Sequence, residues 1–153
     1  KTDGHVSEAC DSDVVLFVSG YKGVPAVLEN PEFMASLTLN PDKQLIGSIC
    51  AGSFILHQLG LLDGAPLTTH PDAKHRLLEM GGDVQDEPLV IVGNIATAGG
   101  CLSALYLTGW VAERLFDADK RREIQRQLIP AGQAEIYENL IHDTIDAALK
   151  QAK

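Results

Sequence analysis

The stretch that decides the fold is Gly47-Ser48-Ile49-Cys50-Ala51-Gly52-Ser53. The apolar run over residues 44–49 predicts a short buried strand, and the apolar pattern over residues 53–61 predicts a helix. A cysteine between small residues therefore stands at a tight strand-to-helix turn, as in a nucleophile elbow. The free N–H groups at the start of the helix favour the thiolate, which makes Cys50 the candidate nucleophile. The alternative is a buried cysteine that serves only as a small hydrophobic residue.

A histidine follows in the stretch Thr68-Thr69-His70-Pro71. Residues 68–70 are expected to form a short strand with His70 at its carboxyl end. Functional groups of open α/β sheets gather at the carboxyl ends of the strands, so His70 is expected within hydrogen-bond reach of Cys50, or one water away. There it would activate the thiol or shuttle its proton. The alternative is a loop histidine before a proline that starts a helix.

The rest of the chain alternates strands and helices. A continuous apolar run over residues 14–18 predicts a strand buried on both faces, and residues 89–97 predict a strand or a hairpin hinged at Gly93-Asn94. This alternation implies an α/β fold with a doubly wound parallel sheet between two layers of helices, a three-layer sandwich. The expected helices cover residues 25–39, 71–80, 99–116, 119–129 and 133–151.

The composition limits the function classes. The 153 residues predict one domain, and 45% of them are hydrophobic. The net charge of −9 argues against nucleic acid and against an anionic membrane as partners. No apolar run is long enough for a membrane span. Three widely spaced cysteines without zinc spacing predict neither a disulfide framework nor a metal or other cofactor, and a reducing cytoplasm fits them best. Of these cysteines, Cys10 is expected to be exposed. Cys101 is expected to be a small core residue, and the alternative is that it faces the site.

Several motifs together resemble the DJ-1/PfpI superfamily, also called ThiJ/PfpI. The resemblance runs from about residue 13 to about residue 115 and depends on the order and spacing of the motifs. It implies a flavodoxin-like fold and a homodimer. The motifs are Asp13-Val14-Val15-Leu16-Phe17-Val18-Ser19-Gly20-Tyr21-Lys22-Gly23, Cys50-Ala51-Gly52, Gly60-Leu61-Leu62-Asp63-Gly64, Thr68-Thr69-His70-Pro71 and Ile95-Ala96-Thr97-Ala98-Gly99-Gly100.

The resemblance also implies a site. Cys50 would attack an electrophilic carbon, and backbone N–H groups at Gly20, Tyr21 and Ala51 would stabilise the developing oxyanion. The family's reactions are isonitrile hydration, glyoxalase-type conversion of α-oxoaldehydes and amide hydrolysis, so a small-molecule hydrolase, hydratase or glyoxalase-type enzyme is expected. The alternative is a non-enzymatic redox sensor or stress-response protein in which Cys50 is oxidised to a sulfenate or sulfinate. A third alternative is the ligand-sensing domain of a regulator.

One part of the family's pattern is not found in this sequence. Family members begin with a strand–helix unit before the strand that corresponds to residues 13–19, whereas twelve residues precede that strand here. Residues 1–153 are therefore expected to form a single DJ-1/PfpI-like domain that lacks this first unit. The family's acidic residue, which hydrogen-bonds the cysteine, belongs to that unit. The complete protein is accordingly expected to place a carboxyl against Cys50 from outside the given sequence.

Overall fold

A four-stranded sheet forms the centre of the computed structural model, which describes residues 2–20 and 22–152. Its strands, in spatial order, are β1 (Val14–Phe17), β2 (Leu45–Ile49), β6 (Ile95–Ala98) and β5 (Leu89–Val92). β1 and β2 pair in parallel, as do β2 and β6, whereas β5 and β6 pair antiparallel. The sheet is therefore mixed: three of its strands are parallel, as the doubly wound fold predicts, and β5 joins them through the hairpin that was one of the two alternatives for residues 89–97. The tight turn at Gly93-Asn94, with Gly93 at φ +59°, forms the hairpin that reverses the chain.

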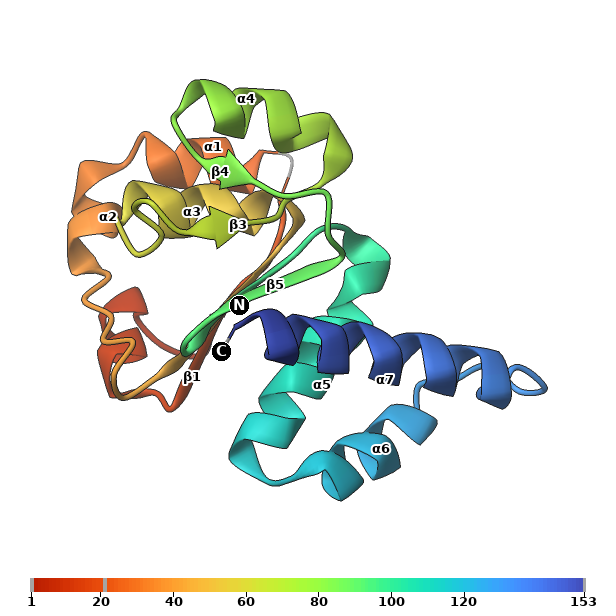
Figure 1. Cartoon of the computed structure of the whole chain (residues 1–153). Helices are drawn as coiled ribbons and strands as arrows, with labels where there is room; N and C mark the ends of the chain where they lie inside the picture. The colour runs from red at the N-terminus through yellow and green to blue at the C-terminus, as the bar shows by residue number, and fades with distance from the viewer. Residues whose placement is uncertain (1, 21, 153) are drawn as a thin grey trace.

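Helices cover both faces of this sheet (Figure 1). The first face carries α1 (Gly23–Leu28), α2 (Pro31–Ser36), α3 (Ser53–Gln58) and α4 (Lys74–Glu79), and the second carries α5 (Ala104–Leu115), α6 (Ala118–Arg126) and α7 (Ala134–Gln151). Each side has its own apolar core, with Phe54 and Leu56 in the first and Trp110 and Ile145 in the second. The expected α/β flavodoxin-like sandwich is confirmed.

The helix expected over residues 25–39 is two helices. α1 ends at Leu28, and α2 begins at Pro31. The side chain of Asn30 accepts a hydrogen bond from the backbone N–H of Phe33 at 3.0 Å and so caps α2. Proline has no N–H to donate and its φ already suits the first turn, so the Asn30-Pro31 pair starts a new helix rather than continuing the old one.

Short elements complete the fold. Two strands, β3 (Pro66–Leu67) and β4 (Asp83–Val84), form a separate parallel pair. The strand expected at residues 68–70 is therefore found slightly earlier in the sequence, as β3, and it does not belong to the main sheet. The backbone N–H of Thr68 donates to the hydroxyl of Thr97 at 2.8 Å, which joins the end of β3 to β6. The remaining elements are the 3₁₀ turns η1 (Val6–Asp11), η2 (Cys50–Gly52), η3 (Pro71–Ala73) and η4 (Cys101–Ser103).

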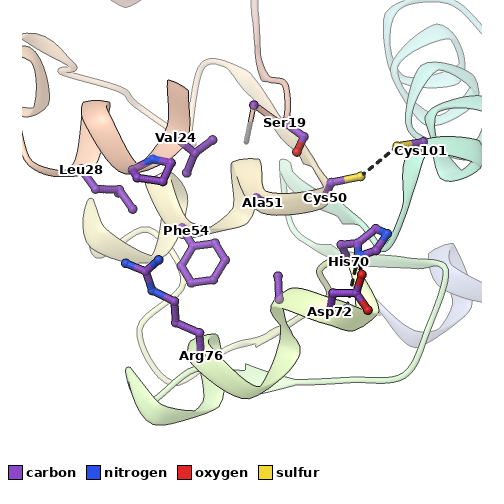
Figure 2. Close-up of a pocket in the computed structure, with 13 residues that line it drawn as sticks. Ser19, Val24, Leu28, Cys50, Ala51, Phe54, His70, Asp72, Arg76 and Cys101 are labelled. Atoms are coloured by element: carbon purple, nitrogen blue, oxygen red, sulfur yellow. Dashed lines mark hydrogen bonds and ion pairs between the residues drawn. The ribbon is translucent and has the colours of Figure 1, made fainter. Parts of the chain in front are cut away.

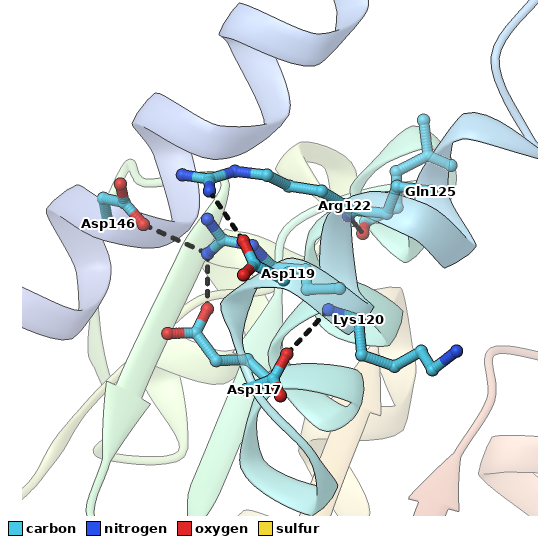
Figure 3. A network of polar contacts seen from close by, with 9 residues as sticks. Asp117, Asp119, Lys120, Arg122, Gln125 and Asp146 are labelled. Atoms are coloured by element: carbon cyan, nitrogen blue, oxygen red, sulfur yellow. Dashed lines mark hydrogen bonds and ion pairs between the residues drawn. The ribbon is translucent and has the colours of Figure 1, made fainter.

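A buried arginine holds the three C-terminal helices together. Arg121 of α6 is 1% exposed and donates from Nη1 to Glu113 Oε2 of α5 at 2.5 Å and to Asp146 Oδ1 of α7 at 3.0 Å. Figure 3 shows the polar network around these ion pairs, with Asp146 on α7. Gly109 lets α5 pack closely against α6, because a Cβ at this position would collide with the side chain of Gln125 of α6. None of the helices in the part of the chain that the structure describes is long and apolar enough to cross a membrane.

Candidate active site

The elbow has the strand, turn and helix in the predicted order. β2 ends at Ile49, Cys50 opens the turn η2, and α3 begins at Ser53. Cys50 has φ +52°, and it is the one non-glycine residue with a positive φ among residues 2–20 and 22–152. Gly52 lies against the end of β1, where a Cβ would collide with the carbonyl oxygen of Phe17. The turn therefore needs glycine at this position, and it holds Cys50 in a strained conformation.

Two hydroxyl groups secure the backbone of the elbow. Ser53 Oγ and Thr69 Oγ1 each donate a hydrogen bond to the carbonyl oxygen of Cys50 at 3.0 Å. Both side chains are buried, so these bonds are shielded from competition with water. The second bond also connects the elbow to the segment that carries His70. The strained residue is thus fixed from its own helix and from a neighbouring loop.

The thiol of Cys50 favours its protonated form. Its pKa is raised from 9.0 to about 11, mainly by burial and to a smaller extent by the hydrogen bond and the charge of Cys101. The side chain is 3% exposed, so a thiolate would lose most of its hydration. The expectation that the helix start would favour the thiolate was wrong on this point. Desolvation by burial is the largest cause of the upward shift in the pKa of Cys50.

Cys101 is the neighbour of Cys50, and the structure favours its site-facing alternative over the expected core position. Its sulfur lies 3.6 Å from that of Cys50, and the residue is exposed rather than part of the core (Figure 2). The signal was present in the sequence. Cys101 comes shortly after β6, which runs parallel to β2, so both cysteines follow the carboxyl ends of adjacent strands.

His70 lies at the same edge of the sheet and lines the same pocket as Cys50. Its Nδ1 accepts the backbone N–H of Asp72 at 3.2 Å and lies 3.7 Å from the carboxylate oxygen Oδ2 of Asp72. Since Nδ1 is an acceptor, the neutral ring carries its proton on Nε2. The hydrogen bonds of the described residues include none between His70 and the Cys50 sulfur. The structure brings the two residues to one pocket but does not join them directly.

The pocket has a volume of about 690 Å³, which is within the range of small-molecule sites. Val24, Leu28 and Phe54 give it an apolar wall. The guanidinium of Arg76 lies 5.6 Å from the centre of the Phe54 ring, on the side away from Cys101 (Figure 2). Gly20 and Ala51, two of the expected oxyanion donors, line the pocket, whereas Tyr21, the third, lies outside the described residues. Within residues 2–20 and 22–152 no cluster of His, Cys, Asp and Glu could hold a metal ion.

An α/β sandwich with a cysteine on a strand-to-helix elbow, beside a pocket at the carboxyl edge of its sheet, defines a class of flavodoxin-like proteins. The comparison with protein families makes the assignment within that class. The family model described as DJ-1/PfpI family matches residues 2–114. This chain belongs to the DJ-1/PfpI family.

Individual relatives agree with this assignment. Protein DJ-1alpha of Drosophila melanogaster is 29% identical over 120 residues, which are 78% of this chain and 55% of that protein. Isonitrile hydratase of Pseudomonas putida is 30% identical over 123 residues, 79% of this chain and 54% of that protein. The structure of a ThiJ/PfpI family protein from Pseudomonas syringae is 22% identical with a TM-score of 0.67, over 92% of this chain and 64% of that chain. The chain thus spans little more than half the length of these two curated relatives.

Proposed function

We propose that this chain belongs to a cysteine-dependent enzyme that hydrolyses, hydrates or rearranges a small electrophilic molecule. The observation that carries the proposal is the position of Cys50, held at positive φ on an elbow that opens into a pocket of about 690 Å³. A structural cysteine needs neither feature. The 30% identity to the isonitrile hydratase of Pseudomonas putida supports a reaction in which a nucleophile adds to an unsaturated carbon.

Three groups would share the chemistry. The Cys50 thiolate attacks the electrophilic carbon, and the backbone N–H of Ala51, with those of Gly20 and Tyr21, stabilises the negative charge that develops on the substrate. His70 then donates its Nε2 proton to the substrate or the leaving group. This role is supported by the hydrogen bond that Asp72 makes to Nδ1, because it leaves the proton on the other ring nitrogen. Solvent base removes the thiol proton of Cys50, so activity should increase with pH.

The walls of the pocket suggest the kind of substrate. The apolar side chains of Val24, Leu28 and Phe54 suit a short hydrocarbon or aromatic group. Arg76, beside Phe54, suits a carboxylate or another anion at the end of the substrate away from Cys50. We therefore expect a compact molecule with an electrophilic carbon at one end and an apolar or anionic group at the other.

Three further features belong to this proposal. The first is a homodimer, supported by Phe116, Ile136 and Leu140, apolar side chains of the C-terminal region that are 64%, 69% and 50% exposed. Light scattering at micromolar concentration should give twice the monomer mass.

The second is a carboxyl supplied against Cys50 from outside the given sequence. The third is a reducing cytoplasm, supported by the free thiols of Cys10, Cys50 and Cys101.

A small panel of substrates tests the enzymatic proposal. The purified chain is incubated with an alkyl isonitrile, an α-oxoaldehyde and an activated amide, and the product is followed by chromatography. We expect turnover of one class, its loss in Cys50→Ser, and a decrease of about a hundredfold in kcat in His70→Ala. Cys10→Ser is the matched control, since Cys10 lies in η1 and does not line the pocket. Equal turnover by Cys50→Ser would contradict the proposal.

A further inference from the structure

The two thiols of the pocket form a pair. Cys50 Sγ and Cys101 Sγ lie 3.6 Å apart, and both residues line the same cavity. A disulfide has a sulfur–sulfur distance of about 2.05 Å, so the sulfurs need to approach by only about 1.5 Å. Side-chain rotation supplies movements of this size. The distance thus places the pair within reach of a covalent bond without a change of fold.

The two cysteines of the pair differ in how far solvent can reach them. Cys50 is buried and fixed by the elbow, whereas Cys101 is exposed at the start of the turn η4. Gly100, which precedes Cys101, has open space where a Cβ would stand, so the turn is not packed tightly on that side. A small oxidant in the pocket therefore meets Cys101 first, and Cys101 has room to move toward the fixed sulfur of Cys50.

We propose that Cys50 and Cys101 are a reversible dithiol–disulfide pair, in which a hydroperoxide oxidises Cys101 and Cys50 closes the disulfide. Cys101 is thus a redox residue of this chain in addition to any role of Cys50 in catalysis. The proposal does not depend on enzymatic turnover. It differs from a sensor that stores a sulfinate on Cys50, because the first oxygen is added to Cys101 and the Cys50 sulfur displaces it before a second oxygen is added.

The chemistry balances in two steps. In the first, the Cys101 sulfur attacks the hydroperoxide, the O–O bond breaks, and a sulfenic acid forms with release of water or an alcohol. In the second, the Cys50 sulfur attacks the Cys101 sulfur, the S–S bond forms, the S–O bond breaks, and hydroxide leaves with the Cys50 proton as water. The two thiols lose two electrons, and the hydroperoxide gains them. A cellular dithiol reverses the change by thiol–disulfide exchange and is itself oxidised.

Disulfide formation has a direct effect on the pocket. It removes the free thiol of Cys50, so the elbow has no nucleophile in the oxidised form. It also protects Cys50 from irreversible oxidation. We therefore expect the oxidised chain to be refractory to alkylation at Cys50 until a dithiol is added.

The test uses the full chain with Cys10→Ser, which leaves only the two thiols of the pair. The protein is treated with one equivalent of hydrogen peroxide, quenched with iodoacetamide and measured by intact mass spectrometry. We expect the loss of two hydrogen masses, no alkylation, peptides around residues 50 and 101 joined to each other, and full recovery of both thiols with dithiothreitol. Cys101→Ser should lose the disulfide completely, and its buried, mainly protonated Cys50 should stay largely reduced under one equivalent of peroxide. Cys50→Ser should retain a sulfenic acid on Cys101 that dimedone traps.

Two experimental results would overturn the proposed disulfide pair. One is a wild-type chain that gains one or two oxygens on Cys50 while Cys101 stays reduced. Another is a disulfide found only between chains, which non-reducing electrophoresis would detect as a dimer. Serine closely matches cysteine in size, so both variants should fold, and circular dichroism checks this. Because the mass of the Cys10→Ser chain is decisive by itself, the outcome does not depend on the folding of either variant.

Discussion

The hydroxyl of Thr69 donates a hydrogen bond to the carbonyl oxygen of Cys50 at 3.0 Å. This bond joins two segments that are separate in the sequence, the elbow after β2 and the loop after β3. His70 follows Thr69 directly, so the bond that supports the strained backbone of Cys50 also sets the position of the histidine. The relative placement of thiol and imidazole thus depends on a residue that need not touch a substrate.

Substitution of Thr69 by valine should weaken this junction. Valine keeps the shape of threonine but removes the donor, and we expect a loss of about 1 kcal/mol in the free energy of unfolding. Urea denaturation followed by circular dichroism measures it. Thr144→Val is the matched control, because the hydroxyl of Thr144 is exposed and bonds only within its own helix, to Leu140. Equal stability of Thr69→Val and wild type would show that the bond adds nothing to the elbow.

Removal of the second thiol should make Cys50 more reactive. In Cys101→Ala the hydrogen bond and the charge that help to raise the pKa of Cys50 are gone, while burial remains. The pKa should therefore fall below about 11 but stay above 9.0. Alkylation of Cys50 by iodoacetamide at neutral pH, followed by peptide mass mapping, should be several-fold faster than in wild type. Cys10→Ala should leave the rate unchanged, and an unchanged rate in Cys101→Ala would contradict the coupling.

The raised pKa of Cys50 also makes stability depend on pH. Above pH 9 the unfolded chain releases this thiol proton, while the folded chain retains it until about pH 11. The folded state then binds more protons than the unfolded state, so the contribution to stability is complete below pH 9 and is lost as the pH rises toward 11. Urea midpoints of wild type and Cys50→Ser should diverge over this interval. Parallel curves would mean that the folded thiol titrates normally.

The buried arginine of the C-terminal helices provides a prediction about stability. In Arg121→Ala, Glu113 and Asp146 would face each other without the cation between them, and we expect a loss of about 3 kcal/mol. Arg122→Ala is the control, since this neighbour is 48% exposed and pairs with Asp119 at the surface, so its loss should stay below about 1 kcal/mol. Denaturant unfolding separates the two variants. Similar losses would show that burial of Arg121 has no special effect.

Loss of Arg121 should also be visible in the titration of His142, a neighbouring residue of α7. Burial lowers the pKa of His142, and the positive charges of Arg121 and Arg122 lower it further. Removing Arg121 should therefore let the pKa of His142 rise toward its ordinary value of 6.5, as an NMR titration of the ring protons would show. A partly folded variant would not give a single titration curve, so this measurement also reports on the fold.

The sequence was most informative where structure is local. The elbow depends on neighbouring residues, an apolar strand followed by Cys50, Ala51 and Gly52, and its order is as predicted. The hairpin at Gly93-Asn94 is another local signal. The start of α2 at Asn30-Pro31 was equally readable, since a capping residue before proline is a start signal. The apolar spacing over residues 25–39 was given more weight than this start signal, so the prediction was one helix instead of two.

Features that depend on contacts between segments distant in the sequence were harder to predict from the sequence. The pKa of Cys50 is set mainly by burial under segments distant in the sequence, and a helix-start rule does not include that cost. The exposure of Cys101 depends on the turn η4, which precedes α5 and places this side chain at the pocket rather than in the core. Parallel pairing of β2 and β6 would have brought both cysteines to one edge, but that pairing itself is a long-range contact.

The positive φ of Cys50 has an evolutionary consequence. Every residue except glycine, and to a lesser degree asparagine and aspartate, carries a cost of about 1–3 kcal/mol in this conformation, so cysteine is retained there against the preference of the backbone. A lineage released from the need for a thiol would gain by drifting to glycine. The residue at position 50 in natural variants of this chain thus indicates whether selection still acts on its chemistry.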